Sequence, residues 1–211
     1  MKLSLRTLIL LFSATMFVAG CASTSGKAPE AVPTRIEMPS YSITCPSGKD
    51  WKQNIDEVSE KIIFVKKFET FLLPGLEKVT SVEVFKNMVL YENWDMTAEE
   101  VAMDYFNHEE EIMRKQGEEK KEYKIKKFEK GSMQIGEKYI YKAYWKASAG
   151  GGWTPLRTTE GTLLLYFPPG FGTNHCFYMV LIVDGYIGIV FKHDPEPAHA
   201  IMASLTINDS K

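Results

Sequence analysis

Four side chains near the end of the chain are of the types that bind metal ions: His193, Asp194, Glu196 and His199. Imidazole nitrogens and carboxylate oxygens are common ligands of zinc and related ions. Two histidines on one face of a helix would need a spacing of four, and His193 and His199 do not have it. Asp194 also has a competing role as a helix cap. We interpret the cluster as a solvated helix start, with His193 and His199 as weak candidate ligands and no metal expected.

The motifs of common enzyme classes do not occur in the sequence. There is no Gly-x-Ser-x-Gly elbow, no phosphate-binding glycine-rich loop and no Cys-x-x-Cys redox pair. His108 and Glu109 could open a zinc-peptidase motif, but Ile112 stands where its second histidine belongs. The sequence therefore predicts no catalytic residue and no cofactor. A hydrolase whose site is assembled from distant residues remains the alternative.

The first 20 residues have the pattern of a secretory signal. Lys2 and Arg6 precede an apolar run over 8–17, which is too short for the ~20 residues of a membrane-spanning helix. Val18-Ala-Gly-Cys21 then resembles the lipobox of bacterial lipoproteins. That resemblance implies cleavage before Cys21 and attachment of a diacylglycerol to this cysteine, which would then bear two or three acyl chains such as palmitate. The alternatives are an ordinary secretory signal with a chance cysteine, or an uncleaved membrane helix.

The residue after the lipobox cysteine bears on the location of the protein. Ala22 stands where an aspartate would resemble an inner-membrane retention signal. We therefore expect a protein anchored by its lipid in the inner leaflet of the outer membrane, facing the periplasm. Two or three acyl chains would make this attachment effectively permanent.

Two cysteines remain after lipidation, Cys45 and Cys176. Disulfides persist in an oxidising compartment, so these two could form one bridge. Two buried free thiols are the other interpretation, and the sequence does not choose between them.

The balance of charge excludes one class of partner. The full chain has 25 basic and 27 acidic side chains, and cleavage of the signal removes Lys2 and Arg6. The mature protein is therefore acidic, which argues against nucleic acid as a partner. A protein of the cell envelope or a small ligand is expected instead.

The mature chain divides into a tether and one domain. Residues 21–40 contain prolines, hydroxyl side chains and scattered apolar residues, which is typical of an extended linker. Residues 41–211 are long enough for one domain with a sizeable core. The sequence of its first part predicts three strands, at 41–45, 61–68 and 80–91. We place the first strand at a sheet edge and expect a polar connection at 48–57.

The second part of the domain predicts two helices around further strands. Thr97 and Glu100 form a capping box, and Gly117 is placed to end that helix. Strands follow, and Asp184-Gly185 is the two-residue turn signature of a β-hairpin. A terminal helix begins at Asp194 as cap. The pattern predicts an α+β fold, a mainly antiparallel sheet flanked by helices.

A long loop is predicted over 148–160, with three consecutive glycines. Trp153 and Arg157 within it are residue types enriched at interface hot spots, so this loop is a candidate binding loop. Trp153 could instead pack onto the sheet beside Trp145.

The order of these elements is similar to the PsbP-like sandwich. An aromatic and proline-containing segment at 41–51, a mid-chain helix, a run of strands and a terminal helix ending Ile201-Met-Ala-Ser-Leu205 carry the resemblance. Members of that superfamily are mostly non-enzymatic accessory subunits and binding domains. The resemblance therefore implies a binding or assembly role and assigns no individual residue.

Overall fold

The computed structural model describes residues 34–48, 50–69, 75–87, 96–120, 123–151, 154–170, 177–188 and 191–208. All of them belong to one compact unit, Val32–Lys211. Cys21, Trp153 and Cys176 lie outside the described residues, and so does the lipobox.

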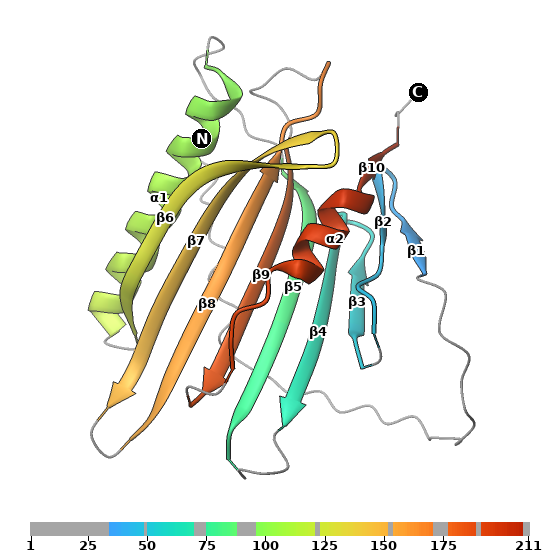
Figure 1. The fold of residues 1–211 in the computed structure, drawn as a ribbon. Helices are drawn as coiled ribbons and strands as arrows, with labels where there is room; N and C mark the ends of the chain where they lie inside the picture. Colours follow the sequence, from blue (N-terminus) through green and yellow to red (C-terminus); the bar gives the residue numbers. More distant parts are fainter. Residues whose placement is uncertain are drawn as a thin grey trace, which may run out of the picture. The chain divides into compact units, whose positions relative to one another are not determined.

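Two antiparallel sheets and two helices form this unit (Figure 1). The large sheet has seven strands in the order β3-β4-β5-β9-β8-β7-β6. Their bounds are Lys52–Asp56 (β3), Lys61–Glu69 (β4), Glu77–Asn87 (β5), Lys124–Ile135 (β6), Lys138–Gly151 (β7), Thr154–Tyr166 (β8) and Phe177–Ile187 (β9). The α+β class and the antiparallel sheet are therefore confirmed.

A small sheet of three strands has the order β1-β2-β10, with β1 at Arg35–Glu37, β2 at Tyr41–Thr44 and β10 at Thr206–Ile207. Two expectations are wrong here. β2 is the central strand of this sheet and not an edge strand. β1 lies in the segment expected to be tether, and Ile36 and Met38 are buried in the core. The folded part therefore begins before Tyr41, because the side chains of Ile36 and Met38 are already part of the core.

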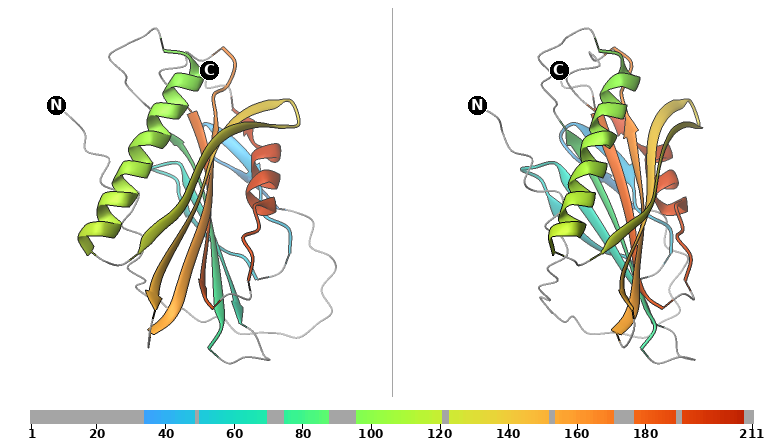
Figure 2. Two further views of the ribbon diagram at one scale, coloured as in Figure 1. Left: turned by 60° about the vertical axis from the view of Figure 1, so that its left-hand side comes forward. Right: turned by 90° about the vertical axis from the view of Figure 1, so that its left-hand side faces the viewer.

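The helices cover opposite faces of the large sheet (Figure 2). Helix α1, Ala98–Lys120, packs on one face through aromatic side chains. The ring of Tyr105 in α1 lies 5.4 Å from that of Phe177 in β9. Helix α2, Glu196–Ser204, lies on the other face, which we name the α2 face. Its core contains Ile62, Phe64, Val82, Val84, Leu164, Tyr178, Val180, Ile182, Ala198, Ile201 and Met202. Neither helix of the described chain is long and apolar enough to cross a bilayer.

The start of α1 forms as the capping box predicts. The backbone N–H of Thr97 donates to Glu100 Oε2 at 2.7 Å, and the N–H of Glu100 donates to Thr97 Oγ1 at 3.3 Å. The predicted end at Gly117 is wrong, since the helix continues to Lys120. A Cβ on Gly117 would lie 2.6 Å from the carbonyl oxygen of Tyr123. This glycine therefore permits a close approach of the chain instead of ending the helix.

The predicted hairpin at Asp184-Gly185 is also wrong. Both residues lie inside β9, paired with β5 on one side and β8 on the other. Neither has the positive φ that a two-residue turn would require. The polar side chain in an otherwise apolar strand is stabilised by partners from distant parts of the chain, described below.

The predicted connection at 48–57 contains β3, and the predicted loop at 148–160 is mostly strand. β7 extends to Gly151 and β8 begins at Thr154, with Ala149 opposite Arg157. A register shift between Ala149 and Gly151 accommodates the glycines. The hairpin pairing satisfies the backbone groups that a free loop would leave to solvent.

Candidate functional site

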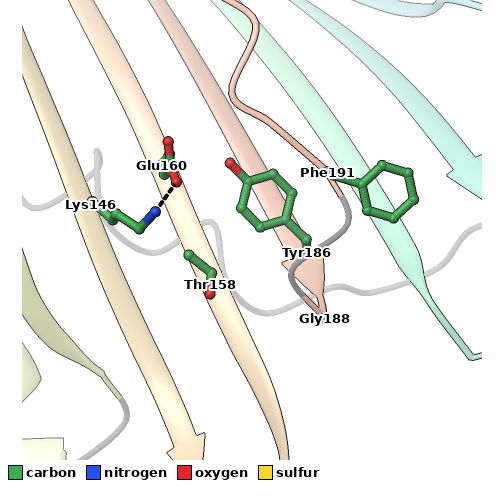
Figure 3. Close-up of a pocket in the computed structure, with 6 residues that line it drawn as sticks. All are labelled: Lys146, Thr158, Glu160, Tyr186, Gly188 and Phe191. Atoms are coloured by element: carbon green, nitrogen blue, oxygen red, sulfur yellow. Dashed lines mark ion pairs between the residues drawn. The ribbon is translucent and has the colours of Figure 1, made fainter.

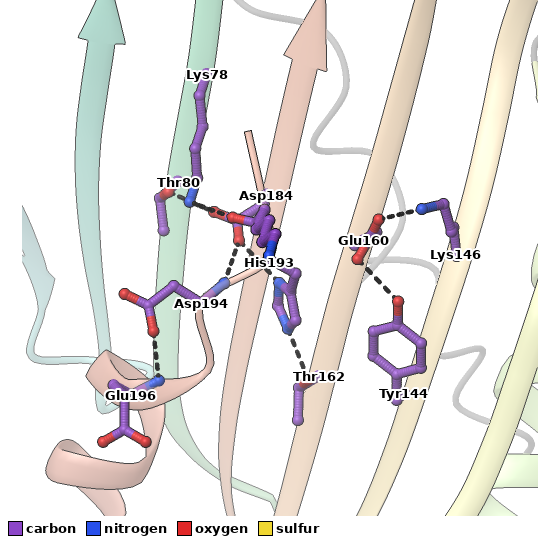
Figure 4. Close-up of polar contacts among 11 residues, drawn as sticks. Lys78, Thr80, Tyr144, Lys146, Glu160, Thr162, Asp184, His193, Asp194 and Glu196 are labelled. Atoms are coloured by element: carbon purple, nitrogen blue, oxygen red, sulfur yellow. Dashed lines mark hydrogen bonds and ion pairs between the residues drawn. The ribbon is translucent and has the colours of Figure 1, made fainter. Parts of the chain in front are cut away.

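The strand register gathers polar side chains at one end of the α2 face. Asp184 in β9 is opposite Thr80 in β5 and Glu160 in β8. Residues two apart on a strand share a face. The same face therefore also contains Lys78, Tyr144, Lys146, Thr158, Thr162 and Tyr186, and we name this whole set the polar cluster. Figure 4 shows most of its members.

The centre of the polar cluster is the carboxylate of Asp184, which is completely buried. It accepts hydrogen bonds from the Thr80 hydroxyl, from Nδ1 of His193 at 2.8 Å and from the backbone N–H of Asp194 at 3.0 Å (Figure 4). Nζ of Lys78 forms an ion pair with it at 3.1 Å. Burial raises the pKa of Asp184, but its bonds with His193 and Thr80, the charge of Lys78 and the Asp194 N–H outweigh burial. The pKa lies below its ordinary value.

His193 joins the carboxylate to a hydroxyl on the neighbouring strand. Because an ionised carboxylate only accepts hydrogen bonds, Nδ1 of His193 bears a proton. Its other nitrogen, Nε2, lies 2.8 Å from Oγ1 of Thr162. With its proton on Nδ1, a neutral imidazole would accept a hydrogen bond from the Thr162 hydroxyl at Nε2. The side chain of His193 is only 7% exposed, so this chain of bonds is largely closed to water.

The segment 191–195 brings His193 to the sheet, and the start of α2 fixes this segment. Asp194 Oδ1 accepts the backbone N–H of Glu196 at 3.1 Å, and Pro195 precedes the first helical residue. The predicted cap is therefore wrong by one residue: Pro195 is the N-cap, without a side-chain cap bond, and the helix begins at Glu196. The backbone N–H of Asp194 bonds to Asp184, so Asp194 joins the start of the helix to the polar cluster.

A second carboxylate, Glu160, lies on the same face. Its Oε1 pairs with Nζ of Lys146 at 2.6 Å, and its Oε2 accepts the Tyr144 hydroxyl at 2.8 Å. Burial raises the pKa of Glu160, and the bonds from Lys146 and Tyr144 outweigh this effect and lower it. Burial, followed by the bond to Glu160, raises the pKa of Tyr144. Glu160 is therefore charged and Tyr144 is neutral near pH 7.

A small hollow of about 70 Å³ opens beside these groups (Figure 3). It is lined by Lys146, Thr158, Glu160, Tyr186, Gly188 and Phe191. Tyr186 is 4% exposed, and its hydroxyl has no hydrogen-bond partner among the described residues. The hydroxyl points toward Glu160, and a weak interaction with this carboxylate is the smallest of the causes that raise its pKa (Figure 3). Burial, followed by the charges of Glu160 and Asp184, raises the pKa of Tyr186, so the hydroxyl keeps its proton.

An unpaired hydroxyl at this depth is unusual, because most buried polar groups are hydrogen-bonded. Each buried polar atom without a partner costs about 1–3 kcal/mol. The hollow has space next to Tyr186 for a polar group that would satisfy this hydroxyl. The geometry therefore suits the binding of a small polar group.

The predicted metal candidates do not converge. Both ring nitrogens of His193 are engaged, by Asp184 and Thr162. Nδ1 of His199 lies 3.9 Å from Glu196 instead, and burial lowers the pKa of His199. Within the described ranges, no group of three or more potential metal ligands is present.

The other predicted site residues lie apart from the polar cluster or outside the described chain. Arg157 is exposed on β8. Cys45 has no disulfide partner among the described residues, its Sγ lies 3.6 Å from Gln53 Oε1, and burial raises the pKa of Cys45. Its pairing with Cys176 remains a prediction, as do the lipidation of Cys21 and a binding role of Trp153.

Sequence reasoning missed Asp184, Thr162, Glu160 and Tyr186 as site residues. One feature of the sequence could have indicated the site: Asp184 is a charged residue within the otherwise apolar strand segment 177–187. A polar residue there needs partners when both faces of the strand are covered. Those partners come from residues up to 106 positions away in the chain, and no local pattern connects them.

Comparison with known proteins gives little further guidance. No protein-family profile matches the chain, and no curated protein matches it. Among solved structures, the chain is similar to the solution structure of cyanobacterial PsbP (CyanoP) from Synechocystis sp. PCC 6803. The two are 10% identical with a TM-score of 0.43, and the match covers 89% of this chain and 98% of that one. At this TM-score the likeness is too distant to assign a function.

Proposed function

We propose that this protein is a lipid-anchored, non-enzymatic binding module of the bacterial cell envelope. Its anchor is the lipidated Cys21, it resides in the outer membrane, and its PsbP-like sandwich faces the periplasm. The hollow beside Tyr186 takes up a small ligand or a side chain of a protein partner. The lipobox resemblance and the acidic mature chain support this assignment.

The observation that carries the binding role is the buried hydroxyl of Tyr186. It faces a hollow in which Glu160 is charged and which the hydroxyl-bearing residue Thr158 also lines. A protein that needed this region only for stability would gain from a phenylalanine at the same position, because no bond would be lost. Retention of the hydroxyl is accounted for by a bound group that pairs with it.

Lipid anchoring is tested by replacing Cys21 with serine. The variant should no longer incorporate labelled fatty acid and should leave the membrane fraction. A Cys45→Ser variant is the control, since this cysteine lies in the folded unit and should not affect anchoring. Unchanged labelling and fractionation of the Cys21→Ser variant would refute the anchor.

A second candidate function is hydrolysis of an acyl substrate, favoured by the Thr162–His193–Asp184 chain. Its two hydrogen bonds of 2.8 Å have the order of a nucleophile, a base and an orienting carboxylate. In such a reaction the Thr162 oxygen would form an ester with the acyl group, and its proton would pass through His193 to the leaving group. Water would then hydrolyse the ester.

The hydrolase function ranks second because the hydroxyl-bearing residue is closed off. Thr162 is 6% exposed and does not line the hollow. The test is p-nitrophenyl acetate hydrolysis by the wild type, Thr162→Ser and Thr162→Val, with mass spectrometry for an acyl adduct. Activity that survives in the serine variant and disappears in the valine variant would establish it. No adduct and no difference between the three would exclude Thr162 as a nucleophile.

A further inference from the structure

The hydrogen-bonding groups that remain unused in the hollow indicate which ligand it takes. This inference rests on the proposed binding function. The hydroxyl of Tyr186 can donate one bond and accept one, and the hydroxyl-bearing residue Thr158 also lines the hollow. Glu160 accepts bonds from Lys146 and Tyr144, and a carboxylate can accept about four. The unused capacity is therefore mainly that of acceptors and hydroxyls, which suits a ligand with O–H groups.

The charges around the hollow are already balanced. Glu160 is paired with Lys146 at 2.6 Å, and Asp184, another carboxylate of the polar cluster, is paired with Lys78 at 3.1 Å. A charged ligand would have to break one of these pairs or lie unpaired next to it. A neutral ligand needs neither. The electrostatics therefore favour a polar but uncharged group.

The walls of the hollow are partly apolar. The ring of Phe191 stacks on that of Tyr186 with centroids 6.4 Å apart and an interplanar angle of 13°. The carbonyl oxygen of Leu156 accepts the N–H of Gly188 at 3.0 Å, which brings Leu156 next to the hollow. Leu156 is 41% exposed. Aromatic and aliphatic surface next to hydroxyl-binding groups suits ligands that have both C–H and O–H faces.

We infer that the hollow binds one hydroxyl-bearing arm of a neutral saccharide. A volume of about 70 Å³ accommodates such an arm and not a whole sugar ring. The hydroxyl of the arm contacts Tyr186 and Glu160, and the C–H face of the ring lies over Phe191 and Leu156. The saccharide thus supplies the partner that the Tyr186 hydroxyl lacks.

The test is isothermal titration of the full-length protein with N,N′-diacetylchitobiose, a neutral disaccharide. Its deacetylated form, chitobiose, is the cationic probe, and digalacturonate is the anionic probe. The neutral sugar should bind more tightly than either charged sugar. Tyr186→Phe should weaken its binding about tenfold, the effect of one hydrogen bond of ~1.4 kcal/mol.

Tyr139→Phe is the matched control. Tyr139 lies on β7, is 55% exposed and does not line the hollow. Its variant should therefore bind the sugar like the wild type. Neutral-sugar binding that does not change in Tyr186→Phe would overturn the inference. Tighter, Tyr186-dependent binding of a charged probe would overturn the inference that the saccharide is neutral but leave the binding function standing. If no probe bound in a Tyr186-dependent manner, the saccharide class and the hollow as a binding site would both be rejected.

Discussion

Nδ1 of His193 lies 2.8 Å from Oδ2 of Asp184, and this contact holds the segment before α2 to the centre of the large sheet. The carboxylate is completely buried in β9, and the imidazole comes from outside the sheet. One ion pair and three hydrogen bonds compensate the cost of burying this charge. The stability of the fold and the shape of the hollow therefore depend on the same residue.

Asp184→Asn should destabilise the protein strongly. The variant removes the charge that pairs with the buried ammonium of Lys78, and it places an amide among donors. Removal of one partner of a buried pair costs about 3–5 kcal/mol. Urea denaturation measures this loss. Glu57→Gln, which removes the same charge from an exposed turn, is the control and should lie within about 0.5 kcal/mol of the wild type. A loss below 1 kcal/mol in Asp184→Asn would contradict the central place of this carboxylate.

The same carboxylate predicts how stability depends on pH. The pKa of Asp184 is lower in the folded chain than its ordinary value of 3.8, so folding favours the ionised form. Its contribution is fully present above pH 3.8 and is lost as pH falls through the folded pKa. The free energy of unfolding should therefore fall on acidification below about pH 4.

The comparison of the wild type with Asp184→Asn isolates this contribution. The difference in unfolding free energy between the two should shrink as pH falls below 4. Lys78 and His193 face residue 184 in both proteins. A difference that is equal at pH 3 and pH 6 would show that Asp184 is not ionised preferentially in the folded chain.

The opposite face of the sheet offers an independent test, the pair Trp145–Gly161. The two residues are cross-strand partners of β7 and β8, and a Cβ on Gly161 would overlap the indole ring. Gly161→Ala should therefore cost about 1–3 kcal/mol, as overpacking does. Gly131→Ala is the control, because the nearest atom to its Cβ would be 4.0 Å away. Equal melting temperatures for the two variants would mean that the indole does not lie on Gly161.

Local patterns predicted the regular parts of the fold well. The capping box at Thr97 is confirmed, because it depends on contacts within a few residues.

The errors occurred where distant residues override a local preference. Asp184-Gly185 has the sequence of a turn, yet Lys78, Thr80 and His193 stabilise the aspartate within a strand. The glycines at 150–152 suggested a loop, yet β7 and β8 pair up to Gly151 and Thr154. The site residues are therefore the ones that a sequence pattern could not identify.

The most direct measurement is the unfolding free energy of Tyr186→Phe in the absence of ligand. The Tyr186 hydroxyl has no partner in the described chain, so its removal should leave the stability unchanged or raise it by up to about 1 kcal/mol. Tyr144→Phe removes a hydroxyl that donates to Glu160 and should lower the stability by about 1–3 kcal/mol in the same assay. A comparable loss in Tyr186→Phe would show that this hydroxyl serves the fold, and it would contradict the binding role of the hollow.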